Sequence, residues 1–160
     1  MDFEFTDEQQ QLRDAVRKWV ERSYSFERRR AAVLAGGFDR AAYGELAALG
    51  LTGLYIPEDQ GGLGMGPVEA MVALEELGRG LVLEPLAQAL IAGGVIHGYA
   101  TAAVRAAWLG RIASGEALVV LACQERTSRW RLDLCATQAQ PAGPGWTIAG
   151  TKSIVPAGDR

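Results

Sequence analysis

The residue types that usually carry chemistry are sparse in this sequence. His97 is the only histidine, so neither a Ser-His-Asp triad nor a Cys/His metal cluster is expected. The glycine-rich stretch 61–66 lacks the Gly-Lys-Ser/Thr ending of a phosphate-binding loop, and it follows Pro57-Glu58-Asp59 instead of a long strand. A tight turn is the simpler interpretation of these glycines. Taken one by one, these residues name no reaction.

The carboxylates and thiols also do not indicate a catalytic site. Glu75 and Glu76 fall in the middle of an expected helix, where a carboxylate is usually exposed or paired. Cys123 and Cys135 form no C-x-x-C motif, and two cysteines make no disulfide framework. Two free thiols in a reducing compartment are the expected state.

Charge and hydropathy exclude several classes of protein. The formal net charge is −3, which does not favour nucleic acid as a partner. The arginines at 28–30 and 40 are interpreted as a solvated helix face. Residues 1–5 are acidic and lack the apolar core of a signal peptide. The longest charge-free apolar run, 85–96, is shorter than the ~20 residues that span a bilayer. We therefore expect a cytoplasmic protein without a membrane span.

Residues 1–115 contain the helix-capping residues and the apolar spacing that are typical of a helical bundle. Thr6 and Gln9 form a capping box, Asp39 and Thr101 stand at the starts of later helices, and Pro67 occupies a first turn. Apolar residues recur at helical spacing between these signals. Helices are expected over 26–34, from 67 and over 86–96, with the helix from 67 largely buried and 86–96 central to the bundle.

The hydrophobic period changes near residue 116. Strands are expected over 117–123, 131–138, 146–148 and 153–155, with a turn at 141–145 and a hairpin connection at 149–152. Four short strands make at best a small open sheet with exposed edges. The predicted fold class is α+β and mainly α: a helical bundle over 1–115, followed by an incomplete antiparallel β domain over 116–160.

The order of motifs along the chain resembles the acyl-CoA dehydrogenase family. The matching pieces are Phe5-Thr6-x-x-Gln9-x-x-Leu12-Arg13, Gly50-Leu51 to Gly64, Glu75-Glu76-Leu77-Gly78, Ile112-Ala113-Ser114-Gly115-Glu116 and Gly145-Trp146-Thr147-Ile148-x-Gly150-x-Lys152. The resemblance implies a helical amino-terminal domain and the start of a middle β-barrel. It implies FAD as cofactor, an acyl-CoA substrate and an electron-transfer flavoprotein as electron acceptor. The family's base is a glutamate of a carboxy-terminal bundle, beyond residue 160, so no catalytic residue is assigned here.

The resemblance also assigns cofactor-binding positions. The family's Thr-Glu-Pro-Gly is matched by Gln124-Glu125-Arg126-Thr127, a later serine by Trp130, and a Trp-Ile-Thr by Ile154-Val155-Pro156. The resemblance implies that the following residues are flavin-binding positions: Cys123, Gln124, Trp130, Ile154 and Pro156. Backbone N–H groups of Cys123 and Gln124 survive these substitutions, whereas Pro156 has none to offer. The stretch 129–133, Arg-Trp-Arg-Leu-Asp, resembles the small-subunit branch of pimeloyl-CoA dehydrogenases.

Three functions stay open at this point. The first is the amino-terminal portion of a flavin-dependent acyl-CoA dehydrogenase, inactive as 160 residues alone, with residues 69–90 lining the acyl pocket. The second is a non-catalytic structural subunit of a heteromeric dehydrogenase, whose altered flavin positions reflect lost cofactor binding. The third is a stand-alone helical interaction module. A homo- or hetero-oligomer is expected, because an open sheet leaves unpaired backbone groups at its edges.

Overall fold

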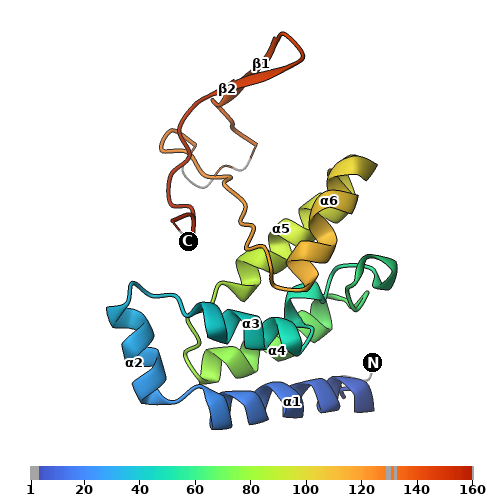
Figure 1. The fold of residues 1–160 in the computed structure, drawn as a ribbon, viewed down its shortest axis with the longest axis vertical. Coiled ribbons are helices and arrows are strands. Elements are labelled where there is room, and N and C mark those ends of the chain that lie inside the picture. The colour runs from blue at the N-terminus through green and yellow to red at the C-terminus, as the bar shows by residue number, and fades with distance from the viewer. Residues whose placement is uncertain (1–3, 129–130, 132, 160) are drawn as a thin grey trace. The chain divides into compact units, whose positions relative to one another are not determined.

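The computed structural model describes residues 4–128, 131 and 133–159. Two compact units divide the chain, one over residues 1–119 and one over residues 120–160. The first unit is helical and the second contains a two-stranded sheet. The mainly helical α+β class and the order of its two parts are as predicted (Figure 1).

The helical unit contains six α-helices and two short 3-10 turns among its described residues. These are α1 (Asp7–Ser23), α2 (Phe26–Leu34), α3 (Arg40–Ala48), η1 (Leu51–Gly53), η2 (Glu58–Gln60), α4 (Pro67–Arg79), α5 (Leu86–Tyr99) and α6 (Ala102–Ala113). The predicted start signals are confirmed at each place. The Gln9 backbone N–H donates to Thr6 Oγ1 at 3.2 Å, and the Thr6 N–H donates to Gln9 Oε1 at 3.0 Å. Asp39 and Thr101 accept backbone N–H groups in the same way, and Pro67 opens α4.

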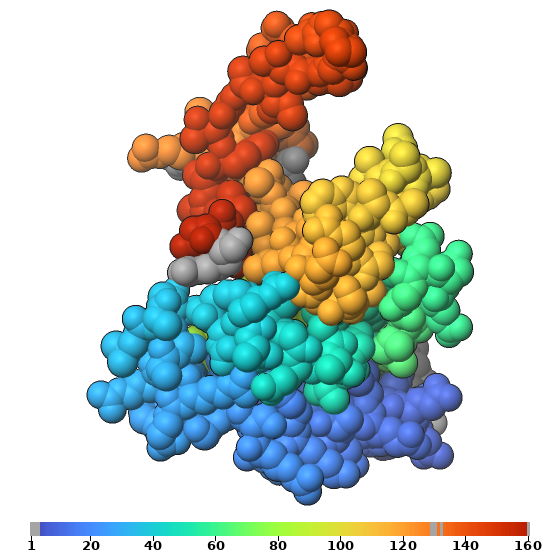
Figure 2. Space-filling model, viewed as in Figure 1, coloured from blue at the N-terminus to red at the C-terminus, as the bar shows by residue number. Residues whose placement is uncertain are grey.

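The core of the helical unit forms where α1 lies along α4 and where α5 lies along α6 (Figure 1). Two clusters of buried apolar side chains fill these contacts. The larger is centred on Val16, Leu46 and Leu54, all fully enclosed, and the smaller on Ile56, Leu109 and Ile112. In the space-filling view α2 lies beside the start of α3 (Figure 2). Burial of these side chains supplies the main stabilisation of the unit.

Two helices are less buried than the sequence predicts. The helix α4, predicted to be largely buried, encloses Val72 and Leu77, but Val68 and Met71 keep 44% and 52% of their surface exposed. The first half of α5 is enclosed, but Ile91 is 51% exposed. Apolar residues on several sides of a helix therefore do not all reach a core here, and part of that surface stays open within the unit.

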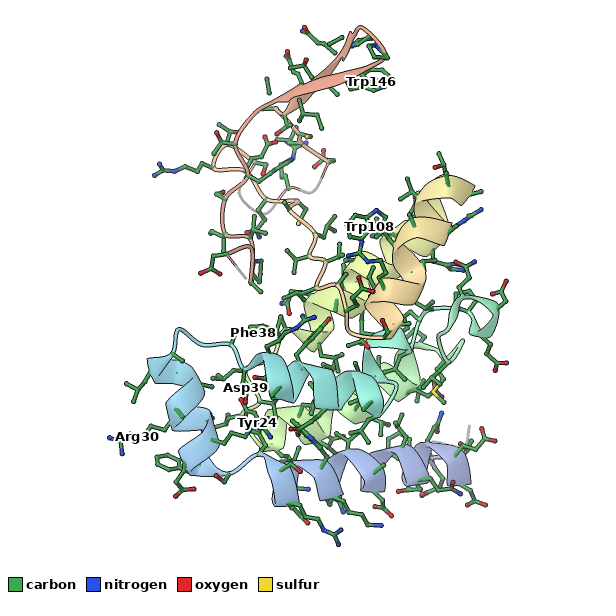
Figure 3. The ribbon with its side chains drawn as sticks, viewed as in Figure 1. Tyr24, Arg30, Phe38, Asp39, Trp108 and Trp146 are labelled. Atoms are coloured by element: carbon green, nitrogen blue, oxygen red, sulfur yellow. The ribbon has the colours of Figure 1, made fainter. Side chains whose placement is uncertain are left out.

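The basic stretch is not a solvated face. Arg28 on α2 donates to Asp39 at 2.8 Å and to both oxygens of Glu45 at 3.0 Å. Arg29 donates to the Gly80 carbonyl at 3.2 Å. Figure 3 shows Arg30 pointing away from the helices, whereas Asp39 lies at the start of α3. Most of this positive charge therefore serves to tie helices together, because a guanidinium can bond two acceptors at once.

We expect the Arg28 cluster to make stability sensitive to acid. Arg28 lowers the pKa of Glu45, and the pKa of Asp39 is also below its usual range, where bonds from Arg28 and from two backbone N–H groups outweigh burial. A lowered pKa contributes stability above the unfolded value, near 4, and that contribution is lost as pH falls through the folded pKa. Arg28→Met should lower the free energy of unfolding by about 2 kcal/mol at pH 7 and flatten its decline in acid.

Arg30→Met is the matched control for that measurement, because Arg30 is exposed on the same helix. Urea unfolding of both variants between pH 3 and pH 7 is the test. Equal pH profiles for the two variants would show that Arg28 contributes nothing beyond its neighbour.

The β part differs from the prediction in where its strands lie. The described residues form one antiparallel pair, β1 (Gln138–Ala142) and β2 (Gly145–Ala149), with Gln138 opposite Ala149. The strand predicted over 146–148 is confirmed within β2. The strands predicted over 117–123 and 153–155 are not formed, and of the described residues in 131–138 only Gln138 belongs to a strand. An apolar run becomes a strand only where a partner strand accepts its backbone hydrogen bonds repeatedly, and the single Ser153–Gln124 bond does not make such a ladder.

The hairpin also turns at a different place. Gly143 and Pro144 connect the paired residues Ala142 and Gly145, so the turn predicted within 141–145 is confirmed but the connection at 149–152 is wrong. Gly143 has φ +58°, which only a glycine adopts easily, and Pro144 supplies the negative φ that follows it. This Gly-X order is typical of a two-residue type II′ hairpin.

Candidate functional site

The predicted cofactor positions all fall in the second unit. Cys123, Ile154 and Pro156 are exposed and Gln124 is half-buried, whereas Trp130 lies outside the described residues. The Ser153 N–H donates to the Gln124 carbonyl at 2.9 Å. This bond brings the segment 123–124 beside the segment 153–156, although 28 or more positions separate them in the sequence.

Ile154 has an unusual conformation for its type. Its φ is +53° and its side chain is 82% exposed. Left-handed backbone is unfavourable for a β-branched residue, so this position cannot extend a regular strand. The Ile154 side chain is therefore an exposed apolar group next to the Gln124 segment.

A buried carboxylate, Glu125, organises this unit and was not among the predicted site residues. It is 5% exposed, and its carboxylate accepts hydrogen bonds from two separate segments of the chain, 135–137 and Lys152. Its Oε2 accepts from the Ala136 N–H at 2.7 Å. Its Oε1 accepts from the Thr137 N–H at 3.0 Å, the Thr137 hydroxyl at 2.6 Å and Lys152 Nζ at 2.8 Å. Both carboxylate oxygens are therefore used as acceptors.

The charges of this pair support each other. The Lys152 ammonium, followed by the Thr137 hydroxyl and the Ala136 N–H, holds the pKa of Glu125 well below its usual range. Glu125 in turn raises the pKa of Lys152. The pair is therefore a carboxylate and an ammonium at neutral pH, and it does not serve as a proton donor or acceptor there.

The sequence contained a signal for this pair. Glu125 stands in the segment matched to the family's Thr-Glu-Pro-Gly, and Lys152 ends the Gly145-to-Lys152 motif. The motifs place Glu125 and Lys152 in family segments but do not predict that the two side chains bind each other. Their contact could not be derived from spacing, because it depends on how 124–125 and 152–153 meet in space.

A second buried carboxylate, Glu76, lies in the helical unit. It is 3% exposed and binds Arg17 at 2.8 Å and Arg79 at 3.0 Å, with Arg13 Nε 4.0 Å away. The hydrogen bond from Arg17 lowers the pKa of Glu76 despite burial. Of the two outcomes considered for the Glu75-Glu76 pair, the paired one applies to Glu76. It locks α1 to α4, because Arg13 and Arg17 lie one turn apart on α1.

Glu76→Gln should lower the free energy of unfolding of the helical unit by about 2 kcal/mol, because it removes the buried negative charge that Arg17 and Arg79 bind. Glu75→Gln is the matched control, since Glu75 is 56% exposed and 3.5 Å from Arg13. That control should change stability by less than about 0.5 kcal/mol. Denaturant titrations measure both, and a control as damaging as Glu76→Gln would contradict the assignment.

A cavity of about 440 Å³ opens between η2 and α6. It is lined by Asp59, Gln60, Ala102, Arg105, Ala106 and Gly110. None of the predicted cofactor residues lines it.

Comparison with known proteins decides the family. Residues 6–116 match the model of the acyl-CoA dehydrogenase N-terminal domain. The chain belongs to the acyl-CoA dehydrogenase family. It is 34% identical over 118 residues to (2S)-methylsuccinyl-CoA dehydrogenase from Cereibacter sphaeroides, covering 69% of this chain and 20% of that protein.

Solved acyl-CoA dehydrogenase structures extend the similarity across both units. A Tcur3481–Tcur3483 steroid ACAD G363A variant superposes with a TM-score of 0.84 at 31% identity, covering 93% of this chain and 41% of that chain. A glutaryl-CoA dehydrogenase from Mycobacterium smegmatis in complex with FADH2 shares the fold, with a TM-score of 0.80 at 20% identity. It covers 94% of this chain and 39% of that one. The chain spans between a fifth and about two-fifths of the length of these relatives.

In this family member the motif 50–64 forms a closely bonded loop. The Gly53 carbonyl accepts from both the Ile56 N–H and the Leu63 N–H at 3.0 Å. The buried Thr52 hydroxyl donates to the Ala113 carbonyl at 2.7 Å and joins the loop to the end of α6. The family motif therefore has a structural role here, as the tight-turn interpretation of its glycines predicts.

Other site types find no support among the described residues. No group of three His, Cys, Asp or Glu side chains there is arranged to hold a metal ion. Within the described part of the chain, no helix is both long and apolar enough to span a bilayer. Cys123 and Cys135 are free and exposed.

Proposed function

We propose that this chain is the amino-terminal portion of an FAD-dependent acyl-CoA dehydrogenase. Residues 1–115 would be its helical domain and residues 116–160 the start of its middle β domain. The observation that carries the proposal is the combination of the domain match over 6–116 with a superposition covering 93% of the chain. A helical interaction module alone would not account for similarity that continues through the second unit.

The proposed reaction is α,β-dehydrogenation of an acyl-CoA thioester. FAD, when bound, supplies the redox chemistry and the protein orients it. In this chain the backbone of Cys123 and Gln124 and the exposed side chain of Ile154 would contact the flavin, and Pro156 and Trp130 occupy the remaining family positions. The apolar residues between 69 and 90 would form one wall of the acyl pocket. The base is not assigned to any of the 160 residues.

The partners follow from the same proposal. Electrons would leave through an electron-transfer flavoprotein, and the dehydrogenase subunits would form a homo- or hetero-oligomer. Half-exposed Val68, Met71 and Ile91 on the helical unit give apolar surface for such contacts. The resemblance to the pimeloyl-CoA dehydrogenase small subunit rests on residues 129–133, of which 129, 130 and 132 lie outside the described residues. Two free cysteines support a reducing, cytoplasmic location.

The residues at two of the flavin positions favour a second candidate function. The positions that the family uses for flavin contact carry Ile154 and Pro156 in this chain, and Pro156 has no N–H to donate. A non-catalytic structural subunit of a heteromeric dehydrogenase would tolerate these residues.

Flavin content separates the two functions. The product of the whole reading frame should be purified, alone and with any dehydrogenase subunit encoded beside it. Stoichiometric FAD absorbance together with bleaching by an acyl-CoA supports the dehydrogenase. A stable protein or complex in which this polypeptide carries no flavin supports the structural subunit.

The isolated 160-residue chain is expected to bind little or no FAD and to have no dehydrogenase activity. The reason is that its flavin-facing segments are exposed and offer few polar contacts, whereas a bound cofactor buries most of its surface. Equilibrium dialysis against FAD measures this. A yellow protein with one flavin per chain would contradict the expectation.

A further inference from the structure

Two separate segments of the second unit, 135–137 and Lys152, meet at a single residue, Glu125. Its side chain accepts from Ala136 and Thr137 on one side and from Lys152 on the other. Its backbone is closed into a turn by Ser128, whose hydroxyl accepts from the Glu125 N–H at 3.2 Å and donates to the Glu125 carbonyl at 3.0 Å. Glu125 is therefore fixed at both the main chain and the side chain.

Two neighbouring residues, Gln124 and Glu125, bind two other neighbouring residues, Ser153 and Lys152. Glu125 binds Lys152 through its side chain, and the preceding carbonyl of Gln124 accepts from the following N–H, that of Ser153. The ion pair and the backbone bond thus act as two neighbouring ties between the same two segments. An exposed ion pair would contribute little, but the Glu125 carboxylate is 5% exposed and its oxygens have several donors.

We propose that Glu125 is a positioning residue whose carboxylate, through Lys152, holds the segment 123–124 against the segment 153–156. This rests on the proposed function only in that those two segments are the ones expected to contact flavin. Glu125 itself would touch neither flavin nor substrate. The other donors, Ala136 and Thr137, keep the carboxylate from swinging toward solvent, so that its position is defined before any cofactor arrives.

Hydrogen exchange at the Ser153 N–H tests the positioning role, because this amide is not bonded to Glu125. Glu125→Gln replaces one acceptor oxygen by an NH₂ group, which must then face a donor. Exchange of the Ala136 and Thr137 amides should speed up for that reason alone. If Glu125 positions the two segments, exchange at Ser153 should also speed up about tenfold or more, although its acceptor is Gln124.

The experiment is amide hydrogen exchange by NMR on the 160-residue chain. Asp133→Asn is the matched control, because Asp133 is a 66%-exposed carboxylate of the same unit paired with Arg131 at 2.6 Å. It should leave Ser153 unchanged. Unchanged exchange at Ser153 in Glu125→Gln, with Ala136 and Thr137 accelerated, would overturn the proposal.

If Glu125→Gln unfolds the second unit, two substitutions of Lys152 test the same ion pair. Lys152→Met leaves the acceptors of Ala136 and Thr137 in place and should still loosen Ser153 about tenfold. Lys152→Arg keeps the cation and should restore protection. Loss of protection in both, or in neither, contradicts a role for the ion pair.

A separate arm connects this result to the cofactor. In the product of the whole reading frame, Glu125→Gln should weaken FAD affinity about tenfold or more, and Asp133→Asn should not. A wild-type product without FAD counts against the dehydrogenase proposal alone, since the exchange result decides the role of Glu125 independently. Unaltered FAD affinity in Glu125→Gln, in a product that binds FAD, would overturn the connection between the positioned segments and flavin binding.

Discussion

Replacing Gly62 with alanine should lower the free energy of unfolding of the helical unit by about 3 kcal/mol or more. A Cβ at this position would meet the backbone carbonyl of Ile56 closer than Cβ atoms approach in real structures. The contact is with main chain, so no side-chain rotation can relieve it. The loop would have to open, and the bonds that Gly53 accepts from Ile56 and Leu63 would be strained.

Two glycines of the same unit provide graded controls. Gly78→Ala places its Cβ in open space on helix α4, so it should be neutral or stabilise by a few tenths of a kcal/mol, because alanine favours the helix. Gly61→Ala also meets nothing, but its φ is +85°, so backbone strain of about 1 kcal/mol is expected. Urea unfolding should rank the losses as Gly62, then Gly61, then Gly78. A Gly62→Ala loss no larger than that of Gly61→Ala would show that the loop accommodates the methyl group.

Truncating Leu46 to alanine should cost about 2–5 kcal/mol of the free energy of unfolding. Leu46 on α3 is fully enclosed in the larger apolar cluster, so the change leaves a cavity that surrounding helices fill only partly. Alanine is itself a good helix former, so the loss measures packing and not helix propensity.

Leu34→Ala is the matched control, with the same substitution in helix α2 at a side chain that is 79% exposed. It should change stability by less than about 0.5 kcal/mol in the isolated chain. Thermal and urea unfolding of both variants, followed by far-ultraviolet circular dichroism, test the pair. Similar losses would mean that the Leu34 surface is covered in solution or that Leu46 is not enclosed.

Helices could be predicted from the sequence because their signals are local. The Thr6–Gln9 capping box, the Asp39 cap and Pro67 each act within one turn of the chain, and α2 begins and ends where expected, at Phe26 and Leu34. What failed was the burial of particular helix faces. Val68 and Met71 carry the right pattern for a core, but whether a neighbour covers them depends on tertiary packing.

Strands were harder to predict because a strand depends on a distant partner. The apolar run 117–123 has strand composition, yet the pairing that forms joins the polar segment 138–142 to 145–149. The local turn chemistry of Gly143-Pro144 determines that pairing more than side-chain hydropathy does. The turn predicted at 141–145 and the strand predicted over 146–148 are confirmed, whereas the strand before the turn was placed at 131–138 and forms at 138–142.

The candidate site shows the same division. Family motifs pointed to the segments 123–124 and 154–156, and the Gln124–Ser153 bond brings those segments together. The carboxylates Glu76 and Glu125 were harder to place, because their partners are remote in sequence. Paired arginines at 13 and 17, one turn apart on α1, are a recognisable partner signal for Glu76. Lys152 has no such paired neighbour in the sequence, so no local pattern predicts that it binds Glu125.

Arg40 has a consequence for protein engineering. From α3 it donates to the carbonyls of Gly115 at 2.8 Å and Glu116 at 2.6 Å, which follow the end of α6. Helix α6 already has a local cap, in which Gly115 has φ +71° and the Ala117 N–H donates to the Arg111 carbonyl at 2.9 Å. Arg40 adds a tie between α3 and the residues that follow this cap. A chimera that grafts a different second unit should therefore be joined after Val119. A junction before Gly115 would replace the residues whose carbonyls bind Arg40, and it would put at risk this tie between α3 and the end of α6.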